Sequence, residues 1–272
     1  MSWAWGSTLL QLALGAITAG VAAIAARKAH ALSRDGAVAA TVVGALAVGA
    51  GWDWGGMLVA FFVVTSALGR IRDAERSRRT RGVVAKGSAR DAMQVAANGG
   101  VLAAAAVGQI LSPHPAWQAL GAGALAAAAA DSWATELGTL SSRPPRHILT
   151  FRAVPHGTSG GVSLIGSTAS VAGAAFMGAM AWTLGWSGAT ALAAAIAGVA
   201  GSLVDSLLGA TLQSRRWCDE CNARTEQLIH SCGGETRPAG GVSWLDNDWV
   251  NMIATATGGA IALVLIAGWG HT

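Results

Sequence analysis

Hydrophobic residues gather in eight long runs along the chain, separated by short polar stretches. Ala, Gly, Val and Leu dominate these runs, and charged residues are rare inside them. A hydrocarbon core of about 30 Å needs about 20 helical residues, so the second and third runs are short. We expect those two to be tilted, extended at their ends or partly re-entrant. The predicted spans are residues 7–26, 36–51, 55–69, 94–111, 116–137, 161–184, 188–212 and 250–269.

Composition supports the same interpretation. The chain has 272 residues, of which 53% are hydrophobic and only 12% are charged, whereas a soluble domain carries about 25% charged residues. Its 37 Gly residues suit close helix packing in lipid. The first run lacks a basic segment before it, so we expect a retained span and not a cleaved signal. The sequence therefore predicts an all-α, polytopic transmembrane bundle of about eight spans, with residues 1–272 forming a single integral membrane domain.

Basic residues predict the orientation of this bundle. All 18 Lys and Arg lie in the loops after the first, third, fifth and seventh runs, and the alternate loops carry none. The positive-inside rule then places the basic loops in the cytoplasm and both termini outside, as in a bacterial-type or organellar inner membrane. Because the basic residues are confined to these loops, the pI near 9.6 is an orientation signal and predicts no nucleic-acid partner. Three of the loops are long: the basic loop 70–93, the glycine- and arginine-rich loop 138–160 and the Cys/His loop 214–246.

Acidic residues mark the cytoplasmic ends of three spans. Asp131 and Glu136 end the fifth run, Asp205 ends the seventh, and an Asp/Asn cluster opens the eighth. A carboxylate in a membrane span is costly and by default marks a functional site. Carboxylates without nearby His or Cys suit Mg²⁺, which binds oxygen ligands and bridges to phosphates; the alternative is that they pair with Arg or cap helices. The predicted magnesium ligands are Asp131, Asp205, Asp246, Asp248 and Asn251.

A glycine-rich turn before the sixth span is the first candidate for phosphate binding. Such a turn, leading into a helix N-terminus, presents backbone N–H groups to an anion. Hydroxyl and guanidinium groups add further donors, although an ordinary flexible loop ending in a helix cap fits the same pattern. The candidates here are Arg152, Gly157, Thr158, Ser159, Gly160, Gly161 and Ser163.

The basic loop 70–93 contributes a second group of candidates. Most of its early arginines are expected to contact anionic lipid headgroups. Arg90 differs because it abuts the fourth span, which carries Gln94 and Asn98 on one helical face. A lipid-phosphate or nucleotide-phosphate contact is therefore predicted for Arg90 and Asn98, with Lys86 as a further candidate.

The Cys/His loop contains a Cys-x-x-Cys pair followed by His and Cys: Cys218, Cys221, His230 and Cys232. Three thiolates and one imidazole can complete a tetrahedral zinc site, and a disulfide is disfavoured in the cytoplasm. The alternative is three unrelated thiols. With four protein ligands, the predicted zinc ion is structural and activates no water.

These motifs together resemble a family of integral membrane proteins, formerly of unknown function, that includes the plant chloroplast phytyl-phosphate kinase. The resemblance covers roughly residues 86–251, and the Cys/His cluster varies within that family. It implies transfer of a phosphoryl group from a nucleotide, with CTP the expected donor, to an isoprenoid monophosphate, with Asp131, Glu136, Asp205 and Arg90 in catalytic roles. The motifs are Arg90 with Gln94-Val95 and Asn98-Gly99, the stretch 131–136, Pro155 with 157–163, the stretch 205–211, and 244–248 with Val250-Asn251.

Two other functions stay open, and the first of them would use much the same residues. A cytidylyltransferase would release pyrophosphate and form a CDP-lipid. A transporter of lipid phosphates or ions is less favoured, because transporters place ligands nearer the midplane and here the acids gather at one face. The expected partners are a nucleoside triphosphate, an isoprenyl monophosphate and membrane lipids, and the sequence leaves a homodimer open.

Overall fold

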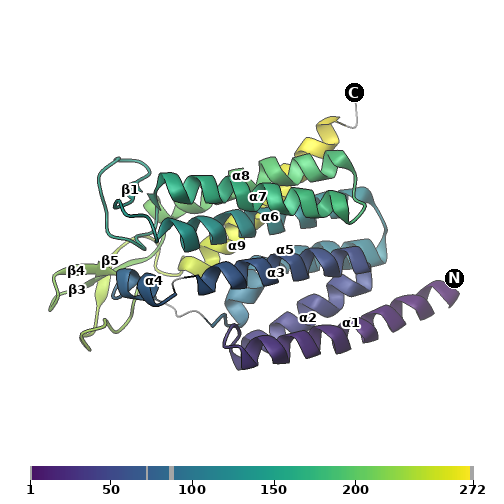
Figure 1. Ribbon diagram of the computed structural model, residues 1–272, viewed down its shortest axis with the longest axis horizontal. Coiled ribbons are helices and arrows are strands. Elements are labelled where there is room, and N and C mark those ends of the chain that lie inside the picture. Colours follow the sequence, from purple (N-terminus) through teal and green to yellow (C-terminus); the bar gives the residue numbers. More distant parts are fainter. Residues whose placement is uncertain (1, 72, 86–88, 270–272) are drawn as a thin grey trace.

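The protein is an all-α membrane protein. The computed structural model describes residues 2–71, 73–85 and 89–269, and these ranges contain eight long helices and one short one. Most of the long helices lie along the long axis of the molecule (Figure 1). Their bounds are α1 Ser2–Lys28, α2 Arg34–Ala50, α3 Trp52–Arg70, α5 Ala92–Leu111, α6 Pro115–Gly138, α7 Leu164–Thr183, α8 Gly188–Thr211 and α9 Asn247–Trp269; the short helix is α4 Asp73–Thr80.

Each predicted span coincides with one long helix, which confirms the transmembrane helical fold. Six of these helices are long and apolar enough to cross a membrane: α1, α3, α5, α7, α8 and α9. The other two long helices, α2 and α6, do not meet this criterion, each for its own reason. α2 has only 17 residues, whereas α6 has 24 residues but is rich in small and polar side chains. The number of crossings and the side of the N-terminus stay predictions.

Helix α6 forms the centre of the bundle. It contacts α3, α5, α7, α8 and α9, and every residue from 121 to 130 is buried. Small residues allow this close packing. A Cβ atom on Gly201 of α8 would lie 2.9 Å from the carbonyl oxygen of Ala254 on α9 and closer still to Ala127 of α6. Three helices therefore meet at Gly201, one turn from Asp205.

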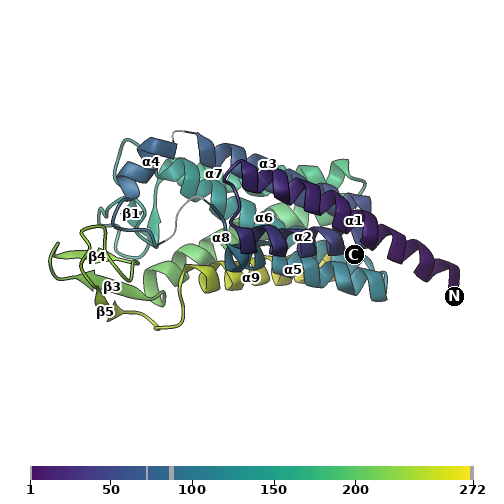
Figure 2. The same ribbon diagram turned by 90° about the horizontal axis from the view of Figure 1, so that it is seen from below.

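The polar loops gather at one end of the bundle. Figures 1 and 2 show α4 and the β-strands together at this end, while α1 begins and α9 ends towards the opposite end. The sequence predicts loops here, and the structure adds two small antiparallel sheets. One pairs β1 (Arg146–His147) with β2 (Gly161–Val162), and the other has the order β4-β3-β5, with β3 Arg215–Cys218, β4 Ala223–Thr225 and β5 Arg237–Gly240.

Candidate functional site

A cavity of about 1310 Å³ lies at the loop end of the bundle. The loop-side ends of α5, α6, α7, α8 and α9 form its walls, and α4 and the glycine-rich turn also line it. Of the predicted site residues, Arg152 is exposed and does not line the cavity, and Lys86 lies outside the described residues. The cavity is lined by Arg90, Asn98, Asp131, Glu136, Gly157, Thr158, Ser159, Gly160, Gly161, Ser163, Asp205, Asp246, Asp248 and Asn251.

Asp131 and Asp205 lie next to each other in the wall of this cavity. α6 positions Asp131 and α8 positions Asp205, and the two carboxyl groups lie within hydrogen-bonding reach of one another. Oδ2 of Asp205 is buried and has no hydrogen-bond partner among the described residues. Two carboxylates in contact repel each other unless a proton or a cation lies between them. The pair and its unsatisfied oxygen therefore fit a hard divalent cation, which takes oxygen ligands.

The two acids at the start of α9 have different environments. Asp246 is exposed and caps the helix, because its Oδ1 accepts hydrogen bonds from the backbone N–H groups of Asp248 at 3.0 Å and Trp249 at 3.2 Å. One of its oxygens is therefore already occupied, as the capping alternative predicted. The side chain of Asp248 is buried and faces the cavity, and Asn251 follows three residues later on the same helical face. Asp248 is thus the more enclosed of the two candidate oxygen ligands on α9.

Glu136 forms an ion pair with Arg76 of α4. This pairing joins the end of α6 to the short helix, and Arg79 strengthens the connection by donating a hydrogen bond of 2.7 Å to the carbonyl oxygen of Ser141. The expectation that the early arginines contact lipid headgroups is therefore wrong for Arg76 and Arg79, because the end of α6 offers them closer acceptors. This ion pair compensates the charge of Glu136 and holds α4 beside the cavity, and the catalytic role expected for Glu136 stays a prediction.

Arg90 is a half-buried cation that forms no ion pair with an acid among the described residues. Its Nη1 donates to Ser66 Oγ at 3.2 Å, and its guanidinium lies 5.7 Å from the centre of the Phe62 ring. Burial lowers the pKa of Arg90 to about 10, and the charges of Arg76 and Arg70 act in the same direction. The side chain remains protonated at neutral pH. Because no ion pair joins it to a carboxylate in the described part of the chain, an anion in the cavity would complete its environment.

The glycine-rich turn offers free backbone donors to the same cavity. Gly157 and Gly160 have positive φ angles of 83° and 75°, a conformation that glycine adopts without strain. Within the described residues, the N–H groups of Ser159 and Gly160 make no hydrogen bond, whereas Thr158 and Gly161 bond inside the turn. Two adjacent unpaired amides suit an anion. The Ser163 hydroxyl instead caps α7, accepting from Gly166 N at 3.1 Å.

Glu226 lines the cavity, although no sequence motif predicts it. It follows β4 in the Cys/His loop, accepts a hydrogen bond from the Ser159 hydroxyl, and accepts another from Gln213 Nε2 at 2.9 Å. Burial raises the pKa of Glu226 to about 6; Asp246 adds to this rise, and the hydrogen bonds from Ser159 and Gln213 oppose it. No motif pointed to it, since it lies in a polar loop where most carboxylates are solvated. Its contact with Ser159 appears only in three dimensions.

The four Cys/His candidates also come together. Their ligand atoms all lie within 4.8 Å of one another, beside the cavity and outside its lining. The candidate oxygen ligands thus lie in the cavity. The candidate sulfur and nitrogen ligands lie at the three-stranded sheet β4-β3-β5, called the loop sheet below.

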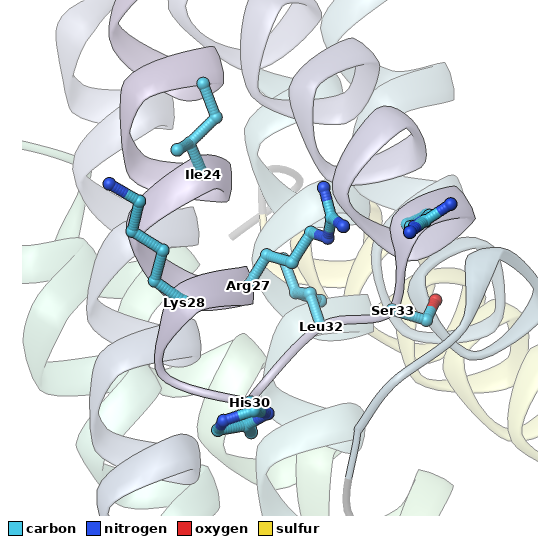
Figure 3. Close-up of a pocket in the computed structure, with 7 residues that line it drawn as sticks. Ile24, Arg27, Lys28, His30, Leu32 and Ser33 are labelled. Carbon is cyan, nitrogen blue, oxygen red and sulfur yellow. The ribbon is translucent and has the colours of Figure 1, made fainter.

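A second cavity of about 530 Å³ lies at the connection between α1 and α2 (Figure 3). Its described lining has no acidic side chain, so it offers no carboxylate ligands for a cation. The lining residues are Ile24, Arg27, Lys28, His30, Leu32, Ser33 and Arg34.

Comparison with known proteins identifies the family. The family described as Integral membrane protein DUF92 matches residues 17–259, which is most of the chain and includes every residue lining the large cavity. The chain belongs to this family.

Three relatives of this DUF92 protein match it over nearly its whole length. Protein PGR of Arabidopsis thaliana is 29% identical over 91% of this chain and 93% of its own length. An uncharacterized membrane protein of Methanocaldococcus jannaschii is 27% identical over 95% of both chains. A further uncharacterized membrane protein, from Synechocystis, is 28% identical over 97% of this chain and 92% of its own. No solved structure matches the chain at a significant level.

Proposed function

We propose that this protein is a membrane-embedded kinase that transfers a phosphoryl group from a nucleoside triphosphate, CTP by resemblance, to an isoprenyl monophosphate. The observation that carries the proposal is the contact between Asp131 and Asp205 in a cavity that also contains Arg90 and free backbone amides. Paired carboxylates suit a magnesium ion, and the guanidinium and amides suit phosphate. Both substrates of a lipid-phosphate kinase carry phosphate, so such a site needs both sets of groups.

Asp131, Asp205 and Asp248 are the residues that would hold the metal. Asp205 Oδ2 is an unsatisfied buried oxygen, and the other two carboxylates line the same cavity. A magnesium ion bound there supplies positive charge that offsets the repulsion between two phosphates. The more exposed Asp246 and the amide of Asn251 add oxygen atoms at the rim.

Arg90 and the glycine-rich turn would orient the phosphates. In the reaction, the bond between the γ-phosphorus and its bridging oxygen breaks and a bond to an oxygen of the lipid phosphate forms. The nucleoside diphosphate leaves with the electron pair of the broken bond. The acceptor oxygen is already ionised, so no strong general base is needed, and catalysis depends on positioning and charge stabilisation. Side chains with fixed donors, such as Arg90 and its Ser66 contact, suit that task.

The lipid tail needs a lateral route from the cavity to the bilayer, and α7 and α8 border one. Val171 of α7 and Leu203 of α8 line the cavity, and they are 54% and 51% exposed. Apolar side chains that are exposed on membrane helices face lipid. Leu203 and Asp205 line the same cavity, so a tail lying against Leu203 would leave its phosphate inside the cavity that contains the carboxylate pair.

Transfer of radiolabel tests the proposal. Purified protein in lipid nanodiscs is given magnesium, a panel of prenyl monophosphates and CTP or ATP labelled at either the α- or the γ-phosphate. A kinase moves the γ-label into the lipid and leaves the α-label in the nucleotide. Asp205→Asn should abolish the transfer, and the matched control Asp219→Asn, which changes an exposed acid in the loop sheet, should retain it.

Other outcomes identify other functions. The appearance of α-label in the lipid, with pyrophosphate release, would establish a cytidylyltransferase instead. Movement of lipid phosphate across proteoliposomes without nucleotide would establish a transporter. Transfer of γ-label by Asp205→Asn at the wild-type rate would refute the role given to the carboxylate pair.

A further inference from the structure

The Cys/His cluster lies on two tight turns of the loop sheet. The first turn joins β3 to β4: Cys218 ends β3, Cys221 follows, and Asn222 has a positive φ of 50°. The second turn contains His230 and Cys232. Each turn therefore presents two ligand atoms, and pairing within the sheet holds β3 and β4 in register.

Backbone hydrogen bonds define the second turn. His230 N donates to Gly234 O at 2.9 Å, and Gly233 N donates to His230 O at 2.8 Å. Gly233 has a φ of +93°, and no atom lies within 4 Å of the position that a Cβ atom would take. A left-handed glycine lets the chain reverse within the three residues between His230 and Gly234. The turn thereby places both ligand atoms on the side facing Cys218.

The distances match one tetrahedral metal ion. The Sγ atoms of Cys218 and Cys232 are 3.7 Å apart, and His230 Nδ1 lies 3.3 Å from Cys232 Sγ. Two sulfur atoms bound to a tetrahedral zinc ion at about 2.3 Å would lie about 3.8 Å apart. A disulfide would bring two sulfur atoms to about 2.05 Å, and all three cysteines are free.

The surroundings of the thiols suit thiolates bound to a metal. The Cys218 side chain is fully buried, and the backbone N–H groups of Cys221 and Glu220 lie near its sulfur. The N–H of Gly234 lies near the Cys232 sulfur, which also contacts Glu220 Oε2 at 3.3 Å. Backbone donors around ligand sulfur atoms are an outer shell that orients metal ligands. Three sulfur ligands and one imidazole nitrogen, with no open position, favour zinc over a hard cation.

We propose that Cys218, Cys221, His230 and Cys232 bind one zinc ion as a closed structural site. This inference does not depend on the proposed kinase activity. Its physical role follows from what the loop sheet contacts. Glu226 N donates to Val83 O at 2.9 Å, and Gln227 Nε2 donates to Val84 O at 2.9 Å, so the loop sheet binds the segment after α4.

The same sheet also contacts the glycine-rich turn. Glu226 accepts the hydrogen bond from Ser159, and Val84 packs near Gly157, where a Cβ atom would lie 3.1 Å from its side chain. The zinc ion thus fixes the two turns of a loop that supports one edge of the cavity. Its loss should loosen that edge while leaving the membrane helices folded.

Metal analysis of the purified full-length protein tests this site. The protein is prepared under reducing conditions with an affinity tag that contains no histidine, passed through metal-free buffer, and analysed for zinc and for free thiols. We expect about one zinc ion per chain. Replacement by Co²⁺ should give the visible absorption of a tetrahedral thiolate site. Cys218→Ser and Cys221→Ser should each reduce bound zinc by on the order of 10-fold or more, because both remove a ligand.

Two controls keep the test decisive. Asp219→Asn lies between the two cysteines and removes a charge but no ligand, so it should retain zinc. Removal of zinc from the wild-type protein by a chelator should increase hydrogen exchange in β3–β5 but not in α6 or α8, and added zinc should restore protection. Stoichiometric free thiols without zinc, or wild-type zinc content in both cysteine variants, would overturn the proposal, whether or not the protein transfers phosphoryl groups.

Discussion

Gly160 lies directly against the backbone of Ala210 at the end of α8. A Cβ atom on Gly160 would lie 2.6 Å from Ala210 Cα and 2.7 Å from Ala210 N, and the φ of Gly160 is +75°. Gly209 makes the same approach possible from the helix side, since its own Cβ position lies 3.1 Å from Gly160 N. The glycine-rich turn therefore packs against the end of α8, one turn after Asp205.

Gly160→Ala should displace this turn. The left-handed φ alone costs about 1–2 kcal/mol for a residue with a side chain, and the contact with Ala210 adds to that cost. Gly185→Ala is the matched control, because Gly185 has a φ of +90° but nothing within 4 Å of its Cβ position. Thermal unfolding in detergent should show a larger loss of stability for Gly160→Ala, and nucleotide affinity should fall in that variant alone. Equal losses in both variants would show that the contact with Ala210 contributes nothing.

Asp131→Asn and Asp205→Asn should lower phosphoryl transfer without unfolding the protein. Loss of one metal ligand should reduce kcat by on the order of 10²-fold, which corresponds to about 3 kcal/mol of transition-state stabilisation. Stability should hold or rise, because each change removes one of two carboxylates in contact. Steady-state kinetics with magnesium titration checks this, and each variant should require more magnesium. Normal turnover in both variants would mean that the pair is structural.

Glu226→Gln should change how stability depends on pH. The pKa of Glu226 rises from 4.5 to about 6 in the folded protein, so the folded state binds the proton more tightly than the unfolded state. Stability is therefore highest below the unfolded pKa and falls as pH rises through the folded pKa, by at most about 2 kcal/mol. A glutamine at this position would keep an acceptor oxygen and remove this loss. Unfolding curves between about pH 4 and pH 8 should converge at low pH and separate at high pH, and parallel curves would contradict the prediction.

Leu203→Trp should interfere with the lipid substrate and spare the nucleotide. Leu203 lines the cavity and is exposed, so a larger side chain there narrows the lateral route between α7 and α8. We expect the KM for a long-chain prenyl monophosphate to rise by about 10-fold and the KM for CTP to stay unchanged. Leu192→Trp is the control, since Leu192 is 55% exposed on the same helix and does not line the cavity. Equal effects of the two substitutions would exclude this route.

The hydrophobic pattern predicted the helices well because membrane burial dominates their energetics. Each of the eight runs became one long helix. α4 was missed because an eight-residue helix of mostly charged residues has no apolar face, and short helices depend on tertiary contacts. Those contacts are the ion pair of Arg76 with Glu136 and the hydrogen bond from Arg79. The strands, of two to four residues, are likewise too short for a periodic pattern.

The candidate site was predictable in its location more than in its bonding. Spacing along the helices indicates which carboxylates reach one face, and Asp131, Asp205 and Asp248 do line one cavity. It does not indicate which of them already have partners. Glu136 carries the same charge but is bound to Arg76, and Asp246 caps α9. Such partners come from distant parts of the chain or from the helix backbone, which spacing alone does not describe.

The central position of α6 has a consequence for how the protein enters the membrane. Its middle is enclosed by other helices and does not face lipid. It therefore needs no strongly apolar side chains, and its residues are mostly Ala and Gly. Insertion by partitioning into lipid depends on the apolar side chains that such a helix lacks. α6 should therefore insert stably only with its neighbours, once α7, α8 and α9 have been synthesised around it. Chains cut after Gly138 should leave this segment poorly inserted, and Asp131 would then reach its final depth only when the whole bundle is assembled.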